Sequence, residues 1–584
     1  MNDPARWPTI ADHRLLGDGR SMALVQPNGT VDWWSAPEPD SPPLLWSLLD
    51  LDGASASFVG AHVLDVPGVV AGPTLMTLLR VGTARVELWD GLVAGDDGPA
   101  LVRLVRCLDA DLDIVHHLDL GGFDQPTATW DGRIATLDSC TLVVTGGHDE
   151  GDGDTRLRAR RATWAALTIA VGGPVEATAD ALWSRLEAAR DEAEEPVATA
   201  RLPAAHQDRG ADAIRVLRAC TYAATGAPVA APTTSLPEAV GGDRNFDYRY
   251  TWLRDSSLAL SVAHLLGAGG VAGPYVEFLR HLGPDGILAT PVRTVRAEEV
   301  PDEREVDGVA GWEGSRPVRV GNDARRQTQY DALGFVLDGL HVHLRSGARL
   351  DRQLWAIVRR LADRCLDDIG EPTSGIWERR TPADLVAADM GRWVTLDRAV
   401  RIARRRRPWH PTRRWRRGRD ASRRRILAAL QPGGRLPQSY SSDEPDASSL
   451  LLVVLGLLPP RSPVATRLID AVRRDLGAGP FVHRYPPSDG DGFHGREGAF
   501  IPVSWWLVSA LALAGRVDEA GEVADGLCAQ IPDLMPEQWD PARSEALGNT
   551  PLLWSHMEAA RALHLLDAAH RGRFRAWRWG RRRP

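Results

Sequence analysis

Several polar loops in the second half of the chain combine carboxylates with tryptophans, which suits them to acid–base chemistry. The first covers residues 230–238 and 241–255 and ends in Tyr-Thr-Trp-Leu-Arg-Asp. The second is Trp377-Glu378 on a glycine turn, and the third places Glu537 just before a tryptophan. A tryptophan ring removes water from a neighbouring carboxylic acid and raises its pKa. Hydrolysis of a glycosidic bond uses two carboxyl groups, one that protonates the leaving oxygen and one that acts on water or on the anomeric carbon.

Each of these residues also has a purely structural interpretation. Acids that open a helix, such as Asp446 in a fourth loop at 443–448, often cap the helix or stabilise its dipole. Arg254 and Asp255 can form a structural ion pair, and Trp377 can belong to the core. Composition and spacing alone leave these alternatives open.

Composition excludes several other chemistries. The sequence contains no lysine, so all 69 basic residues are arginine. A Schiff base to pyridoxal phosphate, a Walker A loop and the phosphate-anchoring lysine of protein kinases are therefore excluded. The chain has 21 tryptophans against 7 tyrosines and 9 phenylalanines. Tryptophan faces suit core packing, partner surfaces and sugar rings alike.

The remaining bulk properties are those of a globular protein of a reducing compartment. The 584 residues are 43% hydrophobic and 25% charged, with a net charge of −8. No window approaches a membrane span, and the N-terminus lacks the apolar core of a signal peptide. The five cysteines are far apart and include no CxxC pair, which argues against a disulfide framework or a cysteine zinc site. We therefore expect a cytoplasmic location.

The pattern of the sequence changes once along the chain. Residues 1 to about 190 contain short β-branched runs separated by Gly, Asp and Pro turns, which favours an antiparallel β-sandwich. Residues 179–198 read as a solvated acidic helix or linker. Apolar residues then recur with helical spacing, and helices are expected to begin near 206, 255, 271, 323, 351, 388, 420, 447, 463, 501, 517 and 553.

These elements imply a multidomain β + α protein. About twelve helices with long loops after every second one fit a toroid of six helical hairpins, whose functional loops gather at one end. The expected parts are a sandwich domain over 1–195, a linker over 196–210, an (α/α)6 domain over 211–570 and an Arg/Trp-rich tail over 571–584.

A series of motifs resembles the family 15 glycoside hydrolases, which include glucoamylases, glucodextranases and bacterial trehalases. The resemblance covers almost the whole chain, and its N-terminal part is similar to the trehalase-like domain of the bacterial branch. The matching motifs, in order, are residues 10–13, 17–20, 29–33, 241–255, 314–322, 375–378, 396–399 and 498–500, Glu537, residues 548–549 and residues 555–556.

The resemblance implies roles for particular residues. Glu378 matches the general acid and Glu537 the general base, while Arg254 and Asp255 match the pair that holds hydroxyls of the non-reducing glucose. Because the family inverts configuration, a water must fit beside the base, and we expect the two carboxyl groups roughly 6.5–9.5 Å apart. No metal or organic cofactor is implied. The remaining substrate-binding residues are Tyr248, Trp252 and Trp377.

Two departures from the family pattern bear on substrate preference. Ala388-Asp389 replaces a usual Ser-Lys pair, and we expect the new anion near the mouth of the site, where it would perturb the pKa of Glu378. Thr550 and Leu552 replace an aromatic residue and an amide in a Gly-Asn-Phe-Pro-Gln pattern.

Two arginine-rich segments surround tryptophans, at 401–425 and at 571–583. Basic residues with interleaved aromatics can mark nucleic-acid binding. The negative net charge and the ordinary charged helix of the family at the first segment favour a solvated surface instead.

We therefore predict an inverting exo-acting α-glucosidase that acts on trehalose or on malto- or isomalto-oligosaccharides, with a slight preference for trehalose or short α-glucosides. We also expect the sandwich domain to shape one wall of the mouth. The expected partner is the α-glucoside alone, without nucleic acid or membrane, and a homo-oligomer is possible. A catalytically impaired carbohydrate-binding relative and, at lower weight, a polyanion-binding protein stay open as alternatives.

Overall fold

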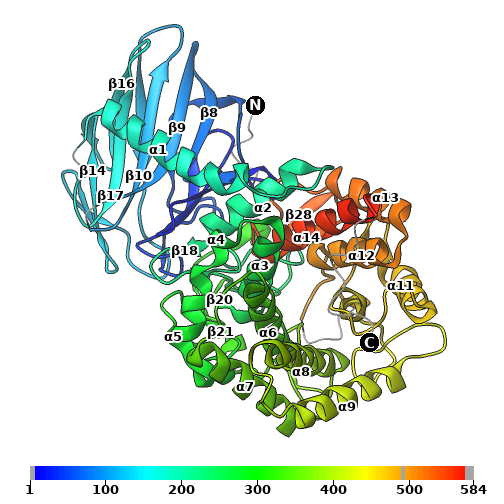
Figure 1. The fold of residues 1–584 in the computed structure, drawn as a ribbon. Coiled ribbons are helices and arrows are strands. Elements are labelled where there is room, and N and C mark those ends of the chain that lie inside the picture. The colour runs from blue at the N-terminus through cyan, green and yellow to red at the C-terminus, as the bar shows by residue number, and fades with distance from the viewer. Residues whose placement is uncertain (1–6, 96, 176, 488–492, 573–584) are drawn as a thin grey trace.

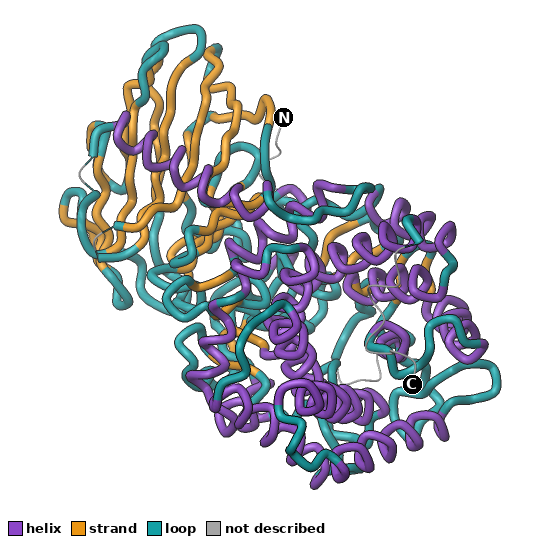
Figure 2. Tube along the Cα trace, in the orientation of Figure 1, coloured by secondary structure: helices purple, strands orange, loops and turns teal. Residues whose placement is uncertain are grey.

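A β-rich N-terminal part lies beside a larger helical part (Figure 1). The computed structural model describes residues 7–95, 97–175, 177–487 and 493–572. Figure 2 shows that most strands belong to the N-terminal part, while short strands in pairs and in one three-stranded sheet lie among the helices. None of the helices in these ranges is long and apolar enough to cross a membrane.

Within the described residues, two large sheets form the sandwich-like N-terminal part. Neighbouring strands are antiparallel except β1 and β7, which are parallel. The first sheet runs β15-β16-β11-β5-β3-β2-β1-β7, with β4 beside β3, and the second runs β12-β13-β14-β17-β10-β9-β8-β6. The bounds in the first sheet are β1 (Arg14–Gly17), β2 (Met22–Val25), β3 (Val31–Ser35), β4 (Pro43–Leu45), β5 (Ala56–Phe58), β7 (Ala71–Gly72), β11 (Leu112–Leu118), β15 (His148–Gly151) and β16 (Asp154–Ala159). Those in the second are β6 (Ala61–Asp65), β8 (Thr74–Val81), β9 (Ala84–Ala94), β10 (Pro99–Cys107), β12 (Thr129–Asp131), β13 (Ile134–Thr136), β14 (Thr141–Thr145) and β17 (Ala165–Val171).

Helix α1 (Ala179–Ala198) covers one face of the second sheet. Its Leu182 and Leu186 side chains are buried with Val102 and Leu104 of β10. The helix expected over these residues is confirmed, but the expectation that it is fully solvated is wrong. Apolar residues spaced four apart form a stripe that packs on the sheet, while the acidic residues face water.

The helical part begins at α2 and ends at α14. Its helices are α2 (Gln207–Ala219), α3 (Leu253–Leu266), α4 (Gly269–Ala272), α5 (Pro274–Ala289), α6 (Tyr330–Arg345), α7 (Arg352–Asp367), α8 (Val386–Arg406), α9 (Arg413–Ala429), α10 (Leu451–Val454), α11 (Pro463–Leu476), α12 (Ile501–Ala514), α13 (Val517–Cys528) and α14 (Leu553–His570). The short strands are β18 (Thr221–Tyr222), β19 (Ala227–Pro228), β20 (Thr251–Trp252), β21 (Val292–Arg293), β22 (Arg304–Glu305), β23 (Arg319–Val320), β24 (Gly477–Ala478), β25 (Phe481–Val482), β26 (Ala499–Phe500), β27 (Gln538–Asp540) and β28 (Glu545–Leu547).

Most helices begin within a few residues of the expected positions. Residues 323–326 form only a 3₁₀ turn, and the long helix α6 starts later, at Tyr330. Helix α9 starts at Arg413 rather than near 420. The sequence pattern indicates a later start because the buried face of the helix carries few large apolar residues among many arginines. Helices that are not consecutive in the chain pack side by side, with α3 against α6, α6 against α8, α12 against α14 and α14 against α3.

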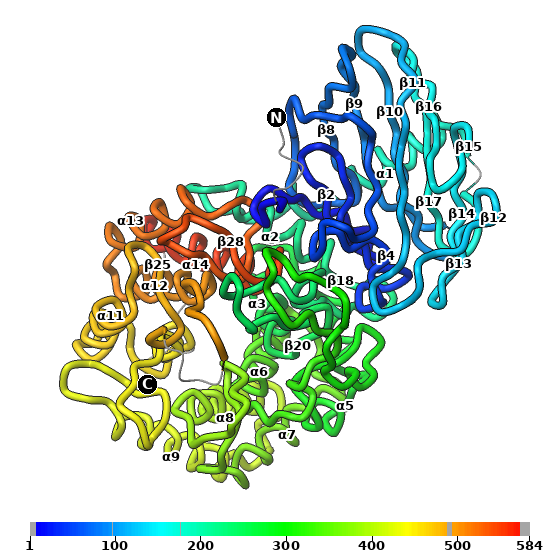
Figure 3. The backbone as a smooth tube through the Cα atoms, turned by 180° about the vertical axis from the view of Figure 1, so that it is seen from behind, coloured from blue at the N-terminus to red at the C-terminus, as the bar shows by residue number. Residues whose placement is uncertain are grey.

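The two parts share one continuous core and contact each other through the loops that lead to the helical part. Figure 3 shows α2 and β18 at this junction. The indole Nε1 of buried Trp33 donates to the carbonyl oxygen of Pro232 at 2.7 Å. Arg249 Nη1 donates to the carbonyl oxygen of Ser41 at 2.6 Å. The N-terminal part thus fixes the first polar loop from behind.

The first arginine-rich segment covers the end of α8, the following loop and most of α9. Trp409 is 76% exposed, whereas Trp415 is buried and donates to Asp363. The second segment lies outside the described residues from 573 onward. All five cysteines are free, as their spacing predicted.

Candidate active site

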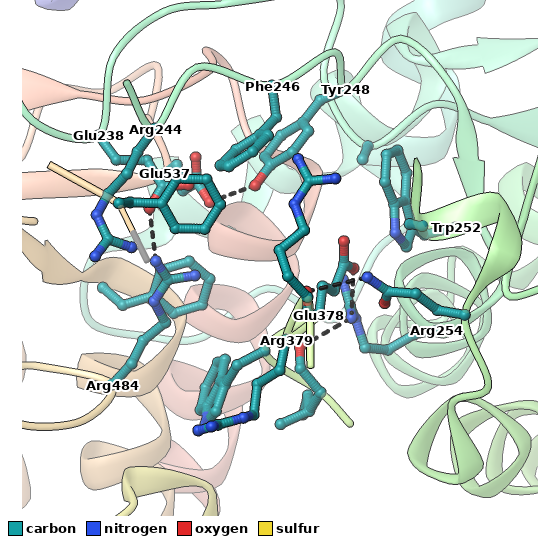
Figure 4. Close-up of a pocket in the computed structure, with 18 of the residues that line it drawn as sticks. Glu238, Arg244, Phe246, Tyr248, Trp252, Arg254, Glu378, Arg379, Arg484 and Glu537 are labelled. Carbon is teal, nitrogen blue, oxygen red and sulfur yellow. Dashed lines mark hydrogen bonds and ion pairs between the residues drawn. The ribbon is translucent and has the colours of Figure 1, made fainter. Parts of the chain in front are cut away.

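A cavity of about 570 Å³ lies among the loops of the helical part (Figure 4). Its volume is typical of a small-molecule site. None of the described residues before Ala230 lines it, so the expectation that the sandwich shapes a wall of the mouth is wrong. The cavity brings together all the site residues predicted from the sequence, which are Tyr248, Trp252, Arg254, Asp255, Trp377, Glu378 and Glu537.

The first polar loop folds back on itself between β19 and β20. Backbone hydrogen bonds join Ala231 to Tyr248, and Ser235 to Phe246. The chain then enters β20, which pairs with β21, and passes directly into α3. This irregular hairpin directs the Tyr248 ring into the cavity.

Arg254 and Asp255 lie in the first turn of α3 and are both buried. Arg254 Nε donates to Asp255 Oδ1 at 2.7 Å, so the ion pair considered from the sequence is present. The same guanidinium also donates from Nη1 to Glu378 Oε1 at 3.1 Å and lies over the Trp554 ring. Burial raises the pKa of Asp255, and the Arg254 charge opposes that rise. Arg254 and Asp255 therefore form a structural ion pair and also line the cavity.

Glu378 lies in a strained turn. Its φ is +56°, an uncommon conformation for a residue with a side chain, and its amide donates to the carbonyl oxygen of Gly375. Gly375, just before the Trp-Glu pair, has a φ of +66°, which favours glycine, and a Cβ there would lie 2.3 Å from Cδ1 of Leu385. The Glu378 side chain is 23% exposed, so one carboxyl oxygen is bound to Arg254 while the group stays open to the cavity.

Trp377 packs in the cavity wall, where its ring meets Phe500 edge-on and lies tilted against Trp506. Its Nε1 donates to both carboxylate oxygens of Asp446 at 3.0 Å. Asp446 also caps a 3₁₀ turn through the amide of Ser448, so its predicted capping role is confirmed. Asp446 therefore also fixes the position of Trp377, the residue before Glu378.

Glu537 is buried on another side of the cavity from Glu378. Its Oε1 accepts a hydrogen bond from the Tyr248 hydroxyl at 2.9 Å, while Oε2 has no hydrogen-bond partner among the described residues. The Cα of Gly548 supports the carboxylate so closely that a Cβ there would lie 2.6 Å from Oε2. Burial, together with the charge of Glu238, raises the pKa of Glu537 well above its usual value. A fixed carboxylate in a cavity wall with a raised pKa is suited to take a proton from water.

Three charged residues beside Glu537 received no role from the sequence. Arg484 Nη2 donates to Glu238 Oε2 at 2.6 Å and also pairs with Glu497. Glu238 and Arg484 line the cavity. Glu238 stands in the first polar loop, but no local pattern indicates its partner Arg484, which lies 246 residues away.

The departures from the family pattern have different consequences. Asp389 is fully buried in α8 and does not line the cavity, so the expectation of an anion near the mouth is wrong. Arg425, Arg392 and the hydroxyl of Tyr440 bind its carboxylate. Leu552 does line the cavity. Among the described residues no group of three or more His, Cys, Asp or Glu side chains is arranged to hold a metal ion.

Fold and site together define a carbohydrate-cleaving hydrolase, and comparisons with known proteins agree. Residues 206–523 match the model of the glycosyl hydrolases family 15, and residues 4–68 match that of the trehalase-like N-terminal domain. The chain therefore belongs to glycosyl hydrolase family 15 and is a trehalase- and glucoamylase-like glycosidase.

Two curated relatives and one solved structure cover nearly the whole chain. A trehalase of Mycolicibacterium smegmatis is 30% identical over 96% of this chain and 92% of its own length. A trehalase of Mycobacterium tuberculosis is 29% identical over 96% of this chain and 90% of its own length. A bacterial glucoamylase complexed with acarbose covers 98% of both chains, with a TM-score of 0.66 and 13% sequence identity, and shows the same fold.

Proposed function

We propose that the protein is an inverting exo-acting α-glucosidase that hydrolyses trehalose or a short α-glucoside. In this proposal Glu378 protonates the glycosidic oxygen and Glu537 removes a proton from the attacking water. The observation that carries it is the buried Glu537 carboxylate in the cavity wall, which accepts a hydrogen bond from Tyr248 at Oε1 and has its pKa raised by burial and by Glu238. Its raised pKa makes it a stronger base than an exposed carboxylate.

The other cavity residues would bind the non-reducing glucose. Arg254 and Asp255 offer a fixed donor and acceptor for sugar hydroxyls at the first turn of α3. Trp252 and Trp377 offer apolar ring faces, which suit the flat faces of a sugar. The trehalase names of the relatives support trehalose as the substrate. The proposal involves no nucleic acid, membrane, metal or organic cofactor.

The proposed architecture behind this site is an (α/α)6 toroid. The packing order α8, α6, α3, α14, α12 and α10 supports it. Arg398 of α8 donates to the carbonyl oxygen of Leu455, just after α10, and so links the first and last of these helices. In this proposal the chain consists of a sandwich domain over 1–195, a linker over 196–210, the toroid over 211–570 and a tail over 571–584.

The test is glucose release from trehalose, maltose, maltotriose, isomaltose and panose by the wild type, Glu378→Gln and Glu537→Gln. Release by the wild type that falls at least about 1,000-fold in Glu537→Gln supports the proposal. Equal turnover by the wild type and Glu537→Gln would overturn the assignment of the base. No turnover, with sugars still raising the melting temperature, would instead favour a carbohydrate-binding relative of the same fold.

A further inference from the structure

Glu238 is a buried carboxylate in the cavity wall beside Glu537 (Figure 4). Its Oε2 accepts hydrogen bonds from Arg484 Nη2 at 2.6 Å and from Gln538 Nε2 at 2.7 Å. Its backbone is fixed on both sides, because its amide donates to Arg244 and its carbonyl oxygen accepts from Gly498. The carboxylate therefore has a defined position.

The two donors connect Glu238 to Glu537 by separate routes. Gln538 follows Glu537 in the chain and begins β27, which pairs with β26 and β28. Its amide bond to Glu238 therefore helps to hold the backbone that carries the Glu537 carboxylate. Arg484 is the cationic neighbour of Glu537 in the cavity wall, and its favourable charge opposes the rise in the pKa of Glu537.

The charges of this cluster are not balanced. Arg484 pairs with Glu238 and Glu497, and Arg244 lies 3.8 Å from Glu497. The carboxylates of Glu238, Glu497 and Glu537 thus share the guanidinium groups of Arg484 and Arg244. Arg484 is already bound by Glu238 and Glu497. The other groups that act on Glu537 are the Tyr248 hydroxyl, which donates to it, and the charge of Glu497.

We propose that Glu238 is a positioning residue for Glu537: it engages Arg484 and Gln538, and so leaves Glu537 in the cavity wall bound by the Tyr248 hydroxyl and not by a guanidinium group. Without the Glu238 charge, Glu497 is the remaining carboxylate that holds Arg484, and the guanidinium group can turn toward Glu537 and compete for the oxygen that must receive the proton. Removing the charge also removes the repulsion that strengthens the base. The inference rests on the proposed function, since it assigns Glu537 as the base.

The test is the pH dependence of kcat/KM for the wild type, Glu238→Gln, Glu238→Asp and Glu497→Gln. We expect Glu238→Gln to move the acid limb to lower pH by roughly one unit and to lower kcat about 10–100-fold. Glu238→Asp keeps the charge and should keep the limb in place. Glu497→Gln is the matched control: it also removes a carboxylate from Arg484, but the charge of Glu497 raises the pKa of Glu537 less than the charge of Glu238 does, so we expect a smaller shift of the limb. An unchanged limb in Glu238→Gln, or an equal shift in Glu497→Gln, would overturn the proposal.

A second measurement separates this inference from the proposed function. Calorimetry with the basic iminosugar 1-deoxynojirimycin reports the ionised carboxylates of the cavity without turnover. We expect the low-pH loss of affinity to shift downward in Glu238→Gln and to stay in place in Glu497→Gln, even if the tested sugars are not cleaved. Identical pH dependence of affinity in the wild type and Glu238→Gln would refute the role of Glu238 by itself. Melting temperatures of all four proteins show whether each variant is folded.

Discussion

Gly548 supports the Glu537 carboxylate, and a single added methyl group there should displace it. A Cβ at Gly548 would lie 2.6 Å from Oε2 and 2.7 Å from Cβ of Glu537. Ordinary contact requires about 3.4 Å, so the carboxylate must move by roughly 0.8 Å. Because a misplacement of about 1 Å can cost roughly 100-fold in rate, we expect Gly548→Ala to lower kcat about 30–100-fold.

The backbone contributes separately to this variant. Gly548 has a φ of +74°, and a non-glycine residue in that conformation costs about 1–2 kcal/mol of stability. Gly314 has the same φ of +74° and nothing within 4 Å of its Cβ position, so Gly314→Ala is a matched control. Both variants should lose similar stability in thermal melts, and only Gly548→Ala should lose activity in the glucose-release assay. Wild-type kcat in folded Gly548→Ala would refute the reasoning that the position of Glu537 limits the rate.

Three further predictions follow from other contacts of the site. Tyr248→Phe removes the hydrogen-bond donor to Glu537 Oε1 and should lower kcat about 10–100-fold. It should also move the acid limb of the pH profile to higher pH, because a bond that favours the ionised carboxylate is lost. An acid limb at the wild-type pH would contradict this prediction. Burial raises the pKa of Asp331 to about 6, above its ordinary value of 3.8, so its ionisation destabilises the fold as pH rises through this interval. Asp331→Asn should therefore gain up to about 3 kcal/mol in chemical denaturation at pH 7.5 and little at pH 4, and an equal gain at both would refute it. Trp33→Phe should reduce both stability and kcat/KM, because it frees the loop at Pro232, whereas Trp34→Phe, whose Nε1 donates to Ser21 within the sandwich, should reduce stability alone.

Glu378 and Asp255 could be identified as candidates because each lies in a short local pattern, while their roles come from the family resemblance. Trp377-Glu378 follows a glycine that its turn requires, and Arg254 and Asp255 open a helix. The Glu238–Arg484 pair could not be predicted in the same way, because its members are 246 residues apart.

The wrong expectations for Asp389 and for the start of α9 have different causes. Asp389 was expected near the mouth, but Arg425, 36 residues later, binds its carboxylate inside the protein. The start of α9 was placed too late because its buried stripe includes Gly418 and Ser422, which give no hydrophobic signal. Local sequence patterns therefore indicate which residues line a cavity. They indicate less reliably which charged side chains pair with each other.

The initial anomer released from trehalose tests the central claim most directly. Attack by water on one α-glucosyl carbon with inversion yields β-glucose, while the leaving glucose keeps its α configuration. Proton NMR at early times should therefore show α- and β-glucose in equal amounts from the wild type, and no release above background from Glu537→Gln. Initial formation of α-glucose alone, or undiminished release by Glu537→Gln, would contradict the assignment of Glu537 as the base of an inverting glycosidase.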